Sequence, residues 1–252
     1  MQHTKKGRIH FIDELRGFAI LCMIFYHTFF TMAFLFSFNS GLKLLAFFMP
    51  FEPYFAGIFI LISGISSQLS HSNIKRGLIL LLIASLITVV TFIFLPDVKI
   101  LFGILHMLSI SIIFFGVFKP FFDLIPTTPG LLLSAVLYIF TMNIREGYLG
   151  ILNIASITIP NILYKTQYLF PIGITNSTFF SSDYFPLFPW IFLFLFGTFL
   201  GRYAKMGLFP EFMYKRKSKF FSFLGTHSLL IYIVHQPIIY IILWIFGLIF
   251  QK

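Results

Sequence analysis

The stretch that decides the fold is IDELRGFAILCMIFYH, from Ile12 to His27. The apolar run that begins here continues to about residue 36, which is long enough for a helix that crosses a bilayer core of about 30 Å. Asp13, Glu14 and Arg16 stand at its start, where charge costs little, but His27 stands near its middle, where an unpaired polar group is expensive. The stretch predicts a membrane helix with a polar edge, whose side chains either form hydrogen bonds with other helices or have a functional role.

Composition places the whole chain in the membrane class. Of its 252 residues, 58% are hydrophobic and only 10% are charged, which leaves more apolar surface than a soluble domain of this length can bury. The single cysteine, Cys22, excludes an internal disulfide framework and a cysteine-based metal cluster. The net charge of +10 comes from short clusters beside apolar runs, so we expect a membrane topology signal and no nucleic-acid partner.

Apolar windows predict an all-α, polytopic membrane helix bundle that forms a single domain over residues 1–252. We expect a multi-pass protein of the cell membrane with membrane lipid around it, and the fifth of its spans is the shortest. The seven predicted spans cover residues 12–36, 51–70, 77–95, 101–118, 130–144, 184–203 and 227–249.

Seven spans divide the 18 Lys and Arg residues unevenly between the two sides, 13 against 5. By the positive-inside rule the N-terminus is then cytoplasmic and the C-terminus external. The larger group is Lys5, Lys6, Arg8, Arg16, Lys75, Arg76, Lys119, Arg202, Lys205, Lys215, Arg216, Lys217 and Lys219, and the smaller is Lys43, Lys99, Arg145, Lys165 and Lys252.

The two longest connections between the predicted spans have compositions that indicate a role. Residues 145–183, rich in Ile, Pro, Ser, Thr and Asn, are expected outside as a lid or a substrate platform. Residues 204–224 form a basic internal loop around Lys215-Arg216-Lys217. This loop is either a topology anchor attracted to anionic lipid or a mouth that attracts phosphate groups.

Helical spacing groups the intramembrane polar residues. Asp13 and Arg16 are spaced i, i+3 and can pair at the cytoplasmic end. His27 follows Arg16 by 11 residues, which places the two on nearly one stripe about 16 Å apart. His106 stands at a depth at which it can meet His27, with Ser109 three residues further on.

The last span carries a second polar face. Ser228, Tyr232 and His235 are spaced i, i+4, i+7, and Pro237 should kink the helix just after them. His235 has two open interpretations, a buried histidine bonded to a neighbour or a functional group. Three histidines suggest a metal site, but no His-x-x-His or Glu-x-x-His spacing supports one, so we expect no metal.

Five short motifs occur in order along almost the whole chain. They are Asp13-x-x-Arg16-Gly17 with Met23-Ile24-x-x-His27, Phe102-Gly103-Ile104-Leu105-His106, Asp183-Tyr184-Phe185-Pro186-x-x-Pro189-Trp190, Gly197-x-x-x-Gly201-Arg202, and Gly225-x-His227-Ser228-Leu229-x-x-Tyr232-x-x-His235-Gln236-Pro237. Each motif alone is weak, but together they resemble those of prokaryotic membrane proteins related to the catalytic domain of heparan-alpha-glucosaminide N-acetyltransferase, within the wider group of transmembrane acyltransferases.

This resemblance implies an acetyltransferase that uses cytoplasmic acetyl-CoA as co-substrate and modifies an amine or hydroxyl of a sugar or related acceptor outside. It also shows a departure. The heparan enzyme has Asn at the position of His27 and its proposed catalytic histidine in the loop after the first span. Residues 36–50 contain no histidine here, so His27 or His106 must take that role.

Acyl transfer from a thioester needs a base, and a neutral imidazole is a suitable one. We therefore expect His27 and His106 to be catalytic and the basic residues of the cytoplasmic end to hold the CoA phosphates. The donor-binding set is Arg16, Arg202, Lys215 and Arg216; the acceptor-binding set is Asp183, Tyr184 and His235; the supporting set is Asp13, Ser228 and Tyr232.

A proton-coupled transporter or channel for a small polar solute is the alternative, because buried histidines also relay protons. The lack of an inverted repeat and the clustering of cations at one end argue against it. Gly197 and Gly201 permit close helix packing within the chain or between chains, so a homodimer is possible.

Overall fold

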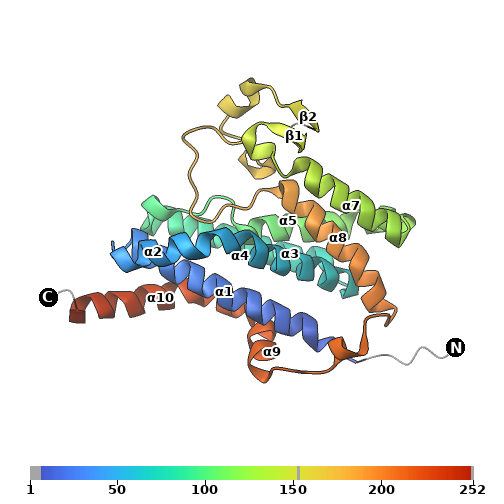
Figure 1. Cartoon of the computed structure of the whole chain (residues 1–252), viewed down its shortest axis with the longest axis horizontal. Helices are drawn as coiled ribbons and strands as arrows, with labels where there is room; N and C mark the ends of the chain where they lie inside the picture. Colours follow the sequence, from blue (N-terminus) through green and yellow to red (C-terminus); the bar gives the residue numbers. More distant parts are fainter. Residues whose placement is uncertain (1–6, 152–153, 251–252) are drawn as a thin grey trace. The chain divides into compact units, whose positions relative to one another are not determined.

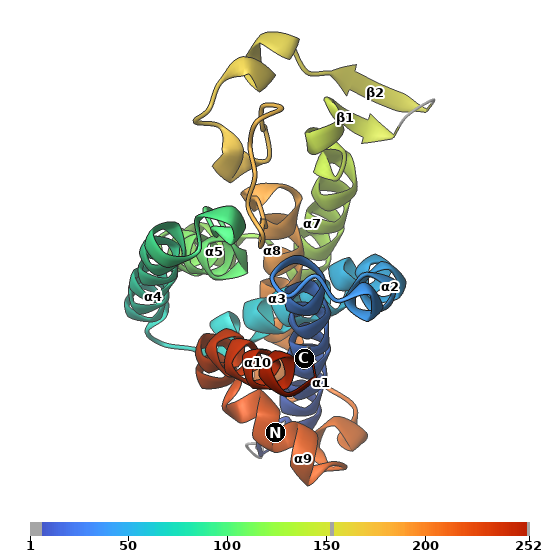
Figure 2. The ribbon, with the colours of Figure 1, turned by 90° about the vertical axis from the view of Figure 1, so that its left-hand side faces the viewer.

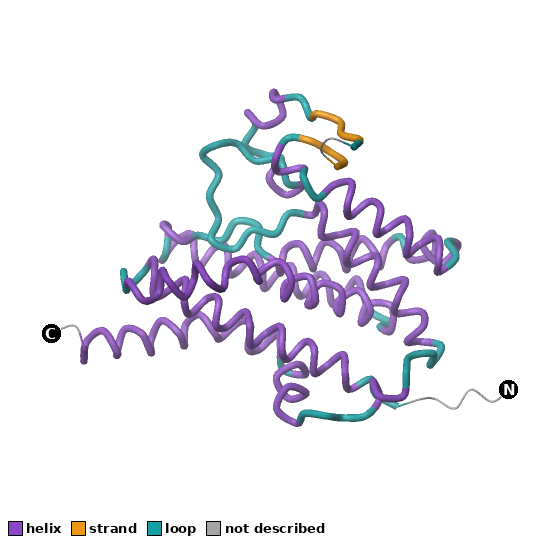
Figure 3. The backbone as a smooth tube through the Cα atoms, viewed as in Figure 1, coloured by secondary structure: helices purple, strands orange, loops and turns teal. Residues whose placement is uncertain are grey.

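The computed structural model describes residues 7–151 and 154–250, and Figure 3 shows that most of them are helical. Lys5, Lys6 and Lys252 of the predicted charge balance lie outside the described residues. The α-helices are α1 (His10–Phe34), α2 (Asn39–Phe48), α3 (Glu52–Leu69), α4 (Asn73–Phe94), α5 (Ile104–Val117), α6 (Lys119–Leu124), α7 (Thr127–Thr141), α8 (Leu187–Lys205), α9 (Lys219–Thr226) and α10 (Ser228–Phe250).

The chain forms two compact units, and the boundary between them falls inside α3. The terminal unit comprises Met1–Phe59 and Phe209–Lys252, and the central unit comprises Ile60–Leu208. In the terminal unit, α1 packs against α2, α9 and α10 (Figure 1). In the central unit, α4 packs against α5 and α7 packs against α8 (Figure 2).

Glycines set the closest helix crossing of the terminal unit. A Cβ at Gly17 of α1 would stand 2.0 Å from the carbonyl oxygen of Phe221 in α9, and one at Gly225 would stand 1.8 Å from the carbonyl oxygen of Asp13. Only a residue without a side chain lets two backbones approach this closely. The crossing therefore joins two of the sequence motifs, the one around Arg16 and the one around His227.

The central unit contains a similar crossing between α3 and α8. A Cβ at Gly197 would stand 2.3 Å from the carbonyl oxygen of Leu61, and one at Gly201 would stand 2.9 Å from that of Ile65. The close packing that this glycine pair permits is thus used within the chain.

The segment between α7 and α8 contains the only strands among the described residues. β1 (Tyr148–Ile151) and β2 (Ala155–Thr158) form an antiparallel hairpin, which the all-α prediction did not include. Ile144, Ile159 and Ile174 form a small buried cluster beneath it, and the Tyr164 hydroxyl donates to the Ile144 carbonyl. The segment that follows α7 therefore has a small hydrophobic core, formed by residues between 144 and 174.

Each of the seven predicted ranges contains a helix, but only six helical stretches in the described residues are long and apolar enough to cross a membrane. α5 has 14 residues and a length of about 21 Å, short of the bilayer core. Its predicted start is wrong: the helix begins at Ile104. Leu101 and Phe102, although apolar, precede it and form hydrogen bonds with Ser181 and Phe185. The six candidates are His10–Phe34, Asn39–Leu69, Asn73–Phe94, Thr127–Glu146, Leu187–Lys205 and Ser228–Leu248.

Candidate functional site

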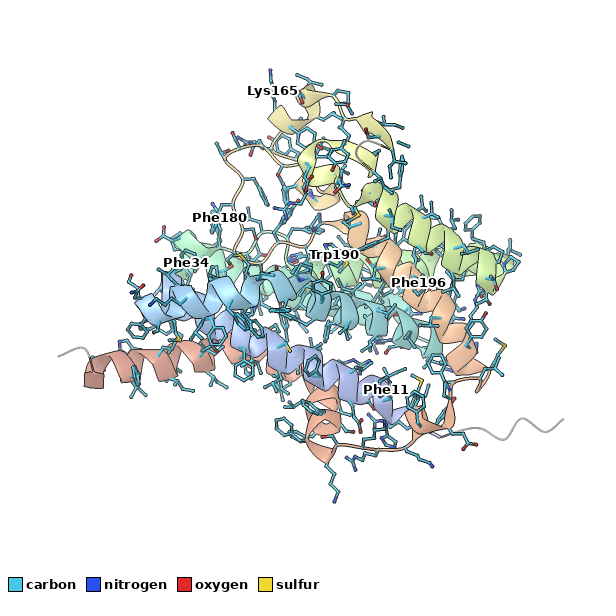
Figure 4. All side chains as sticks on the ribbon, viewed as in Figure 1. Phe11, Phe34, Lys165, Phe180, Trp190 and Phe196 are labelled. Atoms are coloured by element: carbon cyan, nitrogen blue, oxygen red, sulfur yellow. The ribbon has the colours of Figure 1, made fainter. Side chains whose placement is uncertain are left out.

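The first turns of α1 carry an ion-paired carboxylate. Asp13 accepts from Arg16 at 3.3 Å, which confirms the i, i+3 pairing, and from Arg8 at 2.6 Å. The Asp13 residue is 8% exposed and the Arg16 side chain is 19% exposed, so this pair is largely removed from water. Phe11 in Figure 4 marks this end of α1.

Glu14 anchors the basic loop, a role that the sequence analysis missed. One oxygen of its buried carboxylate accepts from the backbone N–H groups of Lys217 and Ser218, at 2.7 and 2.8 Å. Ser218 then caps α9 by accepting from the N–H of Phe221. The exposed side chains of Lys215 and Arg216 are thereby held in the same unit as Asp13 and Arg16.

Further along α1, His27 meets His235 of α10. Their ring centres are 5.0 Å apart and the ring planes differ by 52°. One turn beyond, the Thr31 hydroxyl lies 3.4 Å from the side-chain oxygen of Gln236. The polar edges of the two helices therefore face each other, a pairing that the sequence analysis did not predict.

A backbone carbonyl fixes the tautomer of His235. Its Nδ1 lies 2.6 Å from the carbonyl oxygen of Tyr232, and because a carbonyl only accepts, Nδ1 must carry the proton. In the neutral ring Nε2 then holds a lone pair, and this buried atom has no hydrogen-bond partner among the described residues. The arrangement presents an unused proton acceptor beside His27.

The other members of the predicted face of α10 have different surroundings. Tyr232 is 9% exposed and contributes its carbonyl to His235, while Ser228 is the first residue of the helix. Pro237 lies inside α10, which continues past it to Phe250. The supporting roles of Ser228 and Tyr232 stay predictions.

In the central unit, Asp183 lies against the start of α5. Its carboxylate accepts from the N–H of Ile104 at 3.4 Å, and a Cβ at Gly103 would stand 2.4 Å from the same oxygen. A carboxylate at a helix N-terminus is stabilised by the helix dipole. His106 lies in the first turn of that helix, where its ring stacks on Phe102 at 5.6 Å.

Tyr184 holds the loop segment beside Asp183. Its hydroxyl donates to the carbonyl oxygen of Phe170 at 2.5 Å, and the guanidinium of Arg145 lies 5.1 Å from its ring centre. Burial raises the pKa of Tyr184, and the positive charge of Arg145 opposes part of that rise. The acceptor-binding roles of Asp183 and Tyr184 stay predictions.

The guanidinium of Arg202 closes the end of α6. It donates to the carbonyl oxygens of Ile125 and Phe122, at 2.6 and 2.7 Å, and lies 3.9 Å from Asp123. These contacts satisfy carbonyls that a helix C-terminus leaves without partners. They give Arg202 a structural explanation, and its contact with CoA stays a prediction.

Four of the five motifs meet in two pairs, and the fifth packs on α3. Those of α1 and of α9 with α10 meet in the terminal unit; those around His106 and Asp183 meet in the central unit, where Gly197 and Gly201 pack on α3. Within residues 7–151 and 154–250, no three His, Cys, Asp or Glu side chains are grouped so that they can hold a metal ion.

Comparison with known proteins gives one match. A family model described as the catalytic region of heparan-alpha-glucosaminide N-acetyltransferase matches residues 8–237, which include all five motifs. No curated protein and no solved structure matches the chain. With a match of this extent and six helices suited to crossing a membrane, the chain is a membrane protein that belongs to the heparan-alpha-glucosaminide N-acetyltransferase catalytic family.

Proposed function

We propose that the chain is a transmembrane acetyltransferase of the cell membrane. It takes the acetyl group of acetyl-CoA from the cytoplasm and transfers it to an amine or hydroxyl of a sugar or related acceptor outside. The observation that carries this proposal is the His27–His235 pair: two imidazoles lie 5.0 Å apart, and one of them has a buried Nε2 without a hydrogen-bond partner among the described residues. The same unit holds Lys215 and Arg216. Membership of the family supports the reaction class.

The basic end of the terminal unit suits the donor. Lys215 and Arg216 are exposed cations, and Arg8 keeps 58% of its side chain exposed although it pairs with Asp13. Arginine and lysine bind phosphate oxygens through charge-assisted hydrogen bonds. The rise from Arg16 to His27 along α1 is about 16 Å, a distance that an extended pantetheine arm can bridge. Phosphates held at the basic end would leave the thioester near the histidines.

The two histidines can divide the proton transfers. An imidazole nitrogen removes the proton of the acceptor as its oxygen or nitrogen attacks the thioester carbonyl. When the carbon–sulfur bond breaks, the imidazolium returns that proton to the departing CoA sulfur, so the histidine ends unchanged. His27 is the proposed base; His235, held in one tautomer by Tyr232, orients it or shares the proton. In the central unit, His106 and Asp183 serve the acceptor.

Replacing His27 with Ala tests the assignment. We expect acetyl transfer to fall by a factor of about 10² to 10⁴, which is the usual contribution of a general base. The measurement is transfer of labelled acetyl from acetyl-CoA to glycans of inverted membrane vesicles, with protein abundance measured in parallel. His227→Ala is the matched control, because His227 is an exposed histidine of the same unit.

Full activity in His27→Ala contradicts the role of His27. Solute transport by the purified protein, without binding or cleavage of acetyl-CoA, contradicts the proposed function and favours the transporter. Mass spectrometry of surface glycans from cells with and without the protein identifies the acceptor and the acyl group together.

A further inference from the structure

A cavity of about 440 Å³ opens in the central unit where α3 ends and α4 begins. Both helices belong to stretches that are long and apolar enough to cross a membrane, so their connecting turn is expected at the membrane surface. None of the residues that line it takes part in the proposed acetyl transfer. Its polar lining includes Ser72, Asn73, Lys75, Lys119 and Lys205.

Three lysines from three helices line this cavity. Lys75 comes from the first turn of α4, Lys119 from the start of α6 and Lys205 from the end of α8. Lys119 is paired with Asp123 at 2.9 Å, whereas Lys75 and Lys205 have no ion pair within the described part of the chain. Unneutralised cations around a shared hollow attract an anion.

The first turn of α4 adds backbone donors. Ser72 precedes the helix, and its side chain makes no capping hydrogen bond. The first hydrogen bond of the turn runs from the N–H of Arg76 to the carbonyl of Ser72, so the preceding N–H groups have no acceptor within the helix. Such N–H groups and the positive end of the helix dipole suit a phosphate oxygen.

Asn73 supplies an independent sign of a ligand. The residue is 5% exposed, and its Nδ2 donates to the carbonyl oxygen of Ser67 at 2.9 Å. That bond identifies the remaining atom, Oδ1, as an acceptor, and this buried oxygen has no partner among the described residues. An unpaired buried acceptor raises the free energy of the folded protein. A hydroxyl group of a ligand that donates to Oδ1 would remove this cost.

We propose that this cavity, the α3–α4 phosphate pocket, binds a phosphate ester that carries a neighbouring hydroxyl group. Lys75, Lys205 and the first turn of α4 hold the phosphate, and Asn73 accepts from the hydroxyl. Two sources share this chemistry: the glycerophosphate headgroup of an anionic lipid and the ribose phosphate of a soluble nucleotide. Neither His27 nor His235 lines the pocket, and the proposal does not depend on acetyl transfer.

Isothermal titration of the detergent-purified full chain with glycerol 3-phosphate tests the pocket. We expect the Lys75→Gln/Lys205→Gln variant to bind at least about tenfold more weakly, because it loses two charge-assisted contacts. The charge-conserving Lys75→Arg/Lys205→Arg variant should retain binding, which separates lost charge from lost folding. Lys43→Gln/Lys165→Gln is the matched control, since both lysines are exposed and outside the cavity.

Methyl phosphate, which has no alcohol hydroxyl group, should bind several-fold more weakly than glycerol 3-phosphate; equal binding overturns the role of Asn73. Short-chain phosphatidylglycerol and adenosine 3′,5′-bisphosphate then distinguish the lipid source from the soluble one. An equal loss in the Lys43/Lys165 control, or unchanged affinity in Lys75→Gln/Lys205→Gln, overturns the pocket. Phosphate binding that persists in His27→Ala shows that the two proposals stand separately.

Discussion

Tyr184 illustrates how one residue fastens a loop near a candidate site. Its hydroxyl is a donor to Phe170 only while it is protonated, and burial raises its pKa above the usual value near 10. A folded-state pKa that is raised contributes stability that is fully present below the unfolded pKa. That stability is lost as pH rises through the folded pKa.

We therefore expect Tyr184→Phe to destabilise the protein by about 1 kcal/mol at neutral pH, the usual value of one hydrogen bond. We also expect the variant to lose less stability than the parent as the pH rises above about 10. Thermal unfolding between pH 7 and 11 measures both effects. Tyr168→Phe is the control, because Tyr168 is 84% exposed. An identical alkaline loss in parent and Tyr184→Phe contradicts this role.

The sequence predicted some residue contacts and missed others for a clear reason. The Asp13–Arg16 pair follows from helical spacing alone, because both residues lie on one helix. The His27–His235 contact joins helices some 200 positions apart, and it depends on how α1 and α10 pack. Helical spacing showed which face of each helix is polar. It did not show that the polar faces of α1 and α10 contact each other.

At the scale of elements, the crossing of α1 and α9 has almost no tolerance for a side chain. The carbonyl oxygen of Phe221 is fixed within a helix, so a Cβ at Gly17 cannot be accommodated by a rotamer change. The resemblance marks Gly17 and Gly225 as motif positions, but only the structure shows that they face each other.

We expect Gly17→Ala to separate the two helices and to lower the unfolding temperature by several degrees, since overpacking costs about 1–3 kcal/mol. Thermal unfolding in detergent, with acetyl transfer measured alongside, checks this. Gly7→Ala should change neither, because a Cβ at Gly7 meets nothing within 4 Å. Parent-like stability in Gly17→Ala speaks against a tight crossing.

Element lengths were predicted less well than element positions. Hydropathy alone made residues 101–118 a span, yet α5 begins at Ile104 and ends at Val117. An apolar extended segment and an apolar helical turn have the same hydropathy, so the window could not separate them. The β1–β2 hairpin was missed because its strands are only four residues each.

At the scale of the whole molecule, the proposed sidedness predicts opposite locations for the segments on either side of α8. In a Cys22→Ser background, Lys165→Cys should react with a membrane-impermeant thiol reagent in intact cells. Lys215→Cys should react only after permeabilisation, because positive charge favours the cytoplasmic side. Lys165 is labelled in Figure 4, and both lysines are exposed. Labelling of both positions in intact cells contradicts the proposed sidedness.

The same reagent decides whether α5 crosses the bilayer. Asp97 and Phe121 flank α5 and are exposed. With a crossing, Asp97→Cys and Phe121→Cys label from opposite sides; without one, they label from the same side. The composition predicts a membrane helix bundle, and the distribution of Lys and Arg predicts its orientation. Whether the chain crosses the membrane six or seven times depends on α5 alone.

Glu14 accepts two hydrogen bonds from the basic loop, and these fix the path of the loop without using its side chains. They reach only the backbone N–H groups of Lys217 and Ser218, which every residue except proline provides. The side chains of Lys215 and Arg216 can therefore be exchanged without loss of these two hydrogen bonds. During evolution, or in a designed library, substitutions at these positions can change which anion the loop prefers, while the backbone of the loop keeps its position.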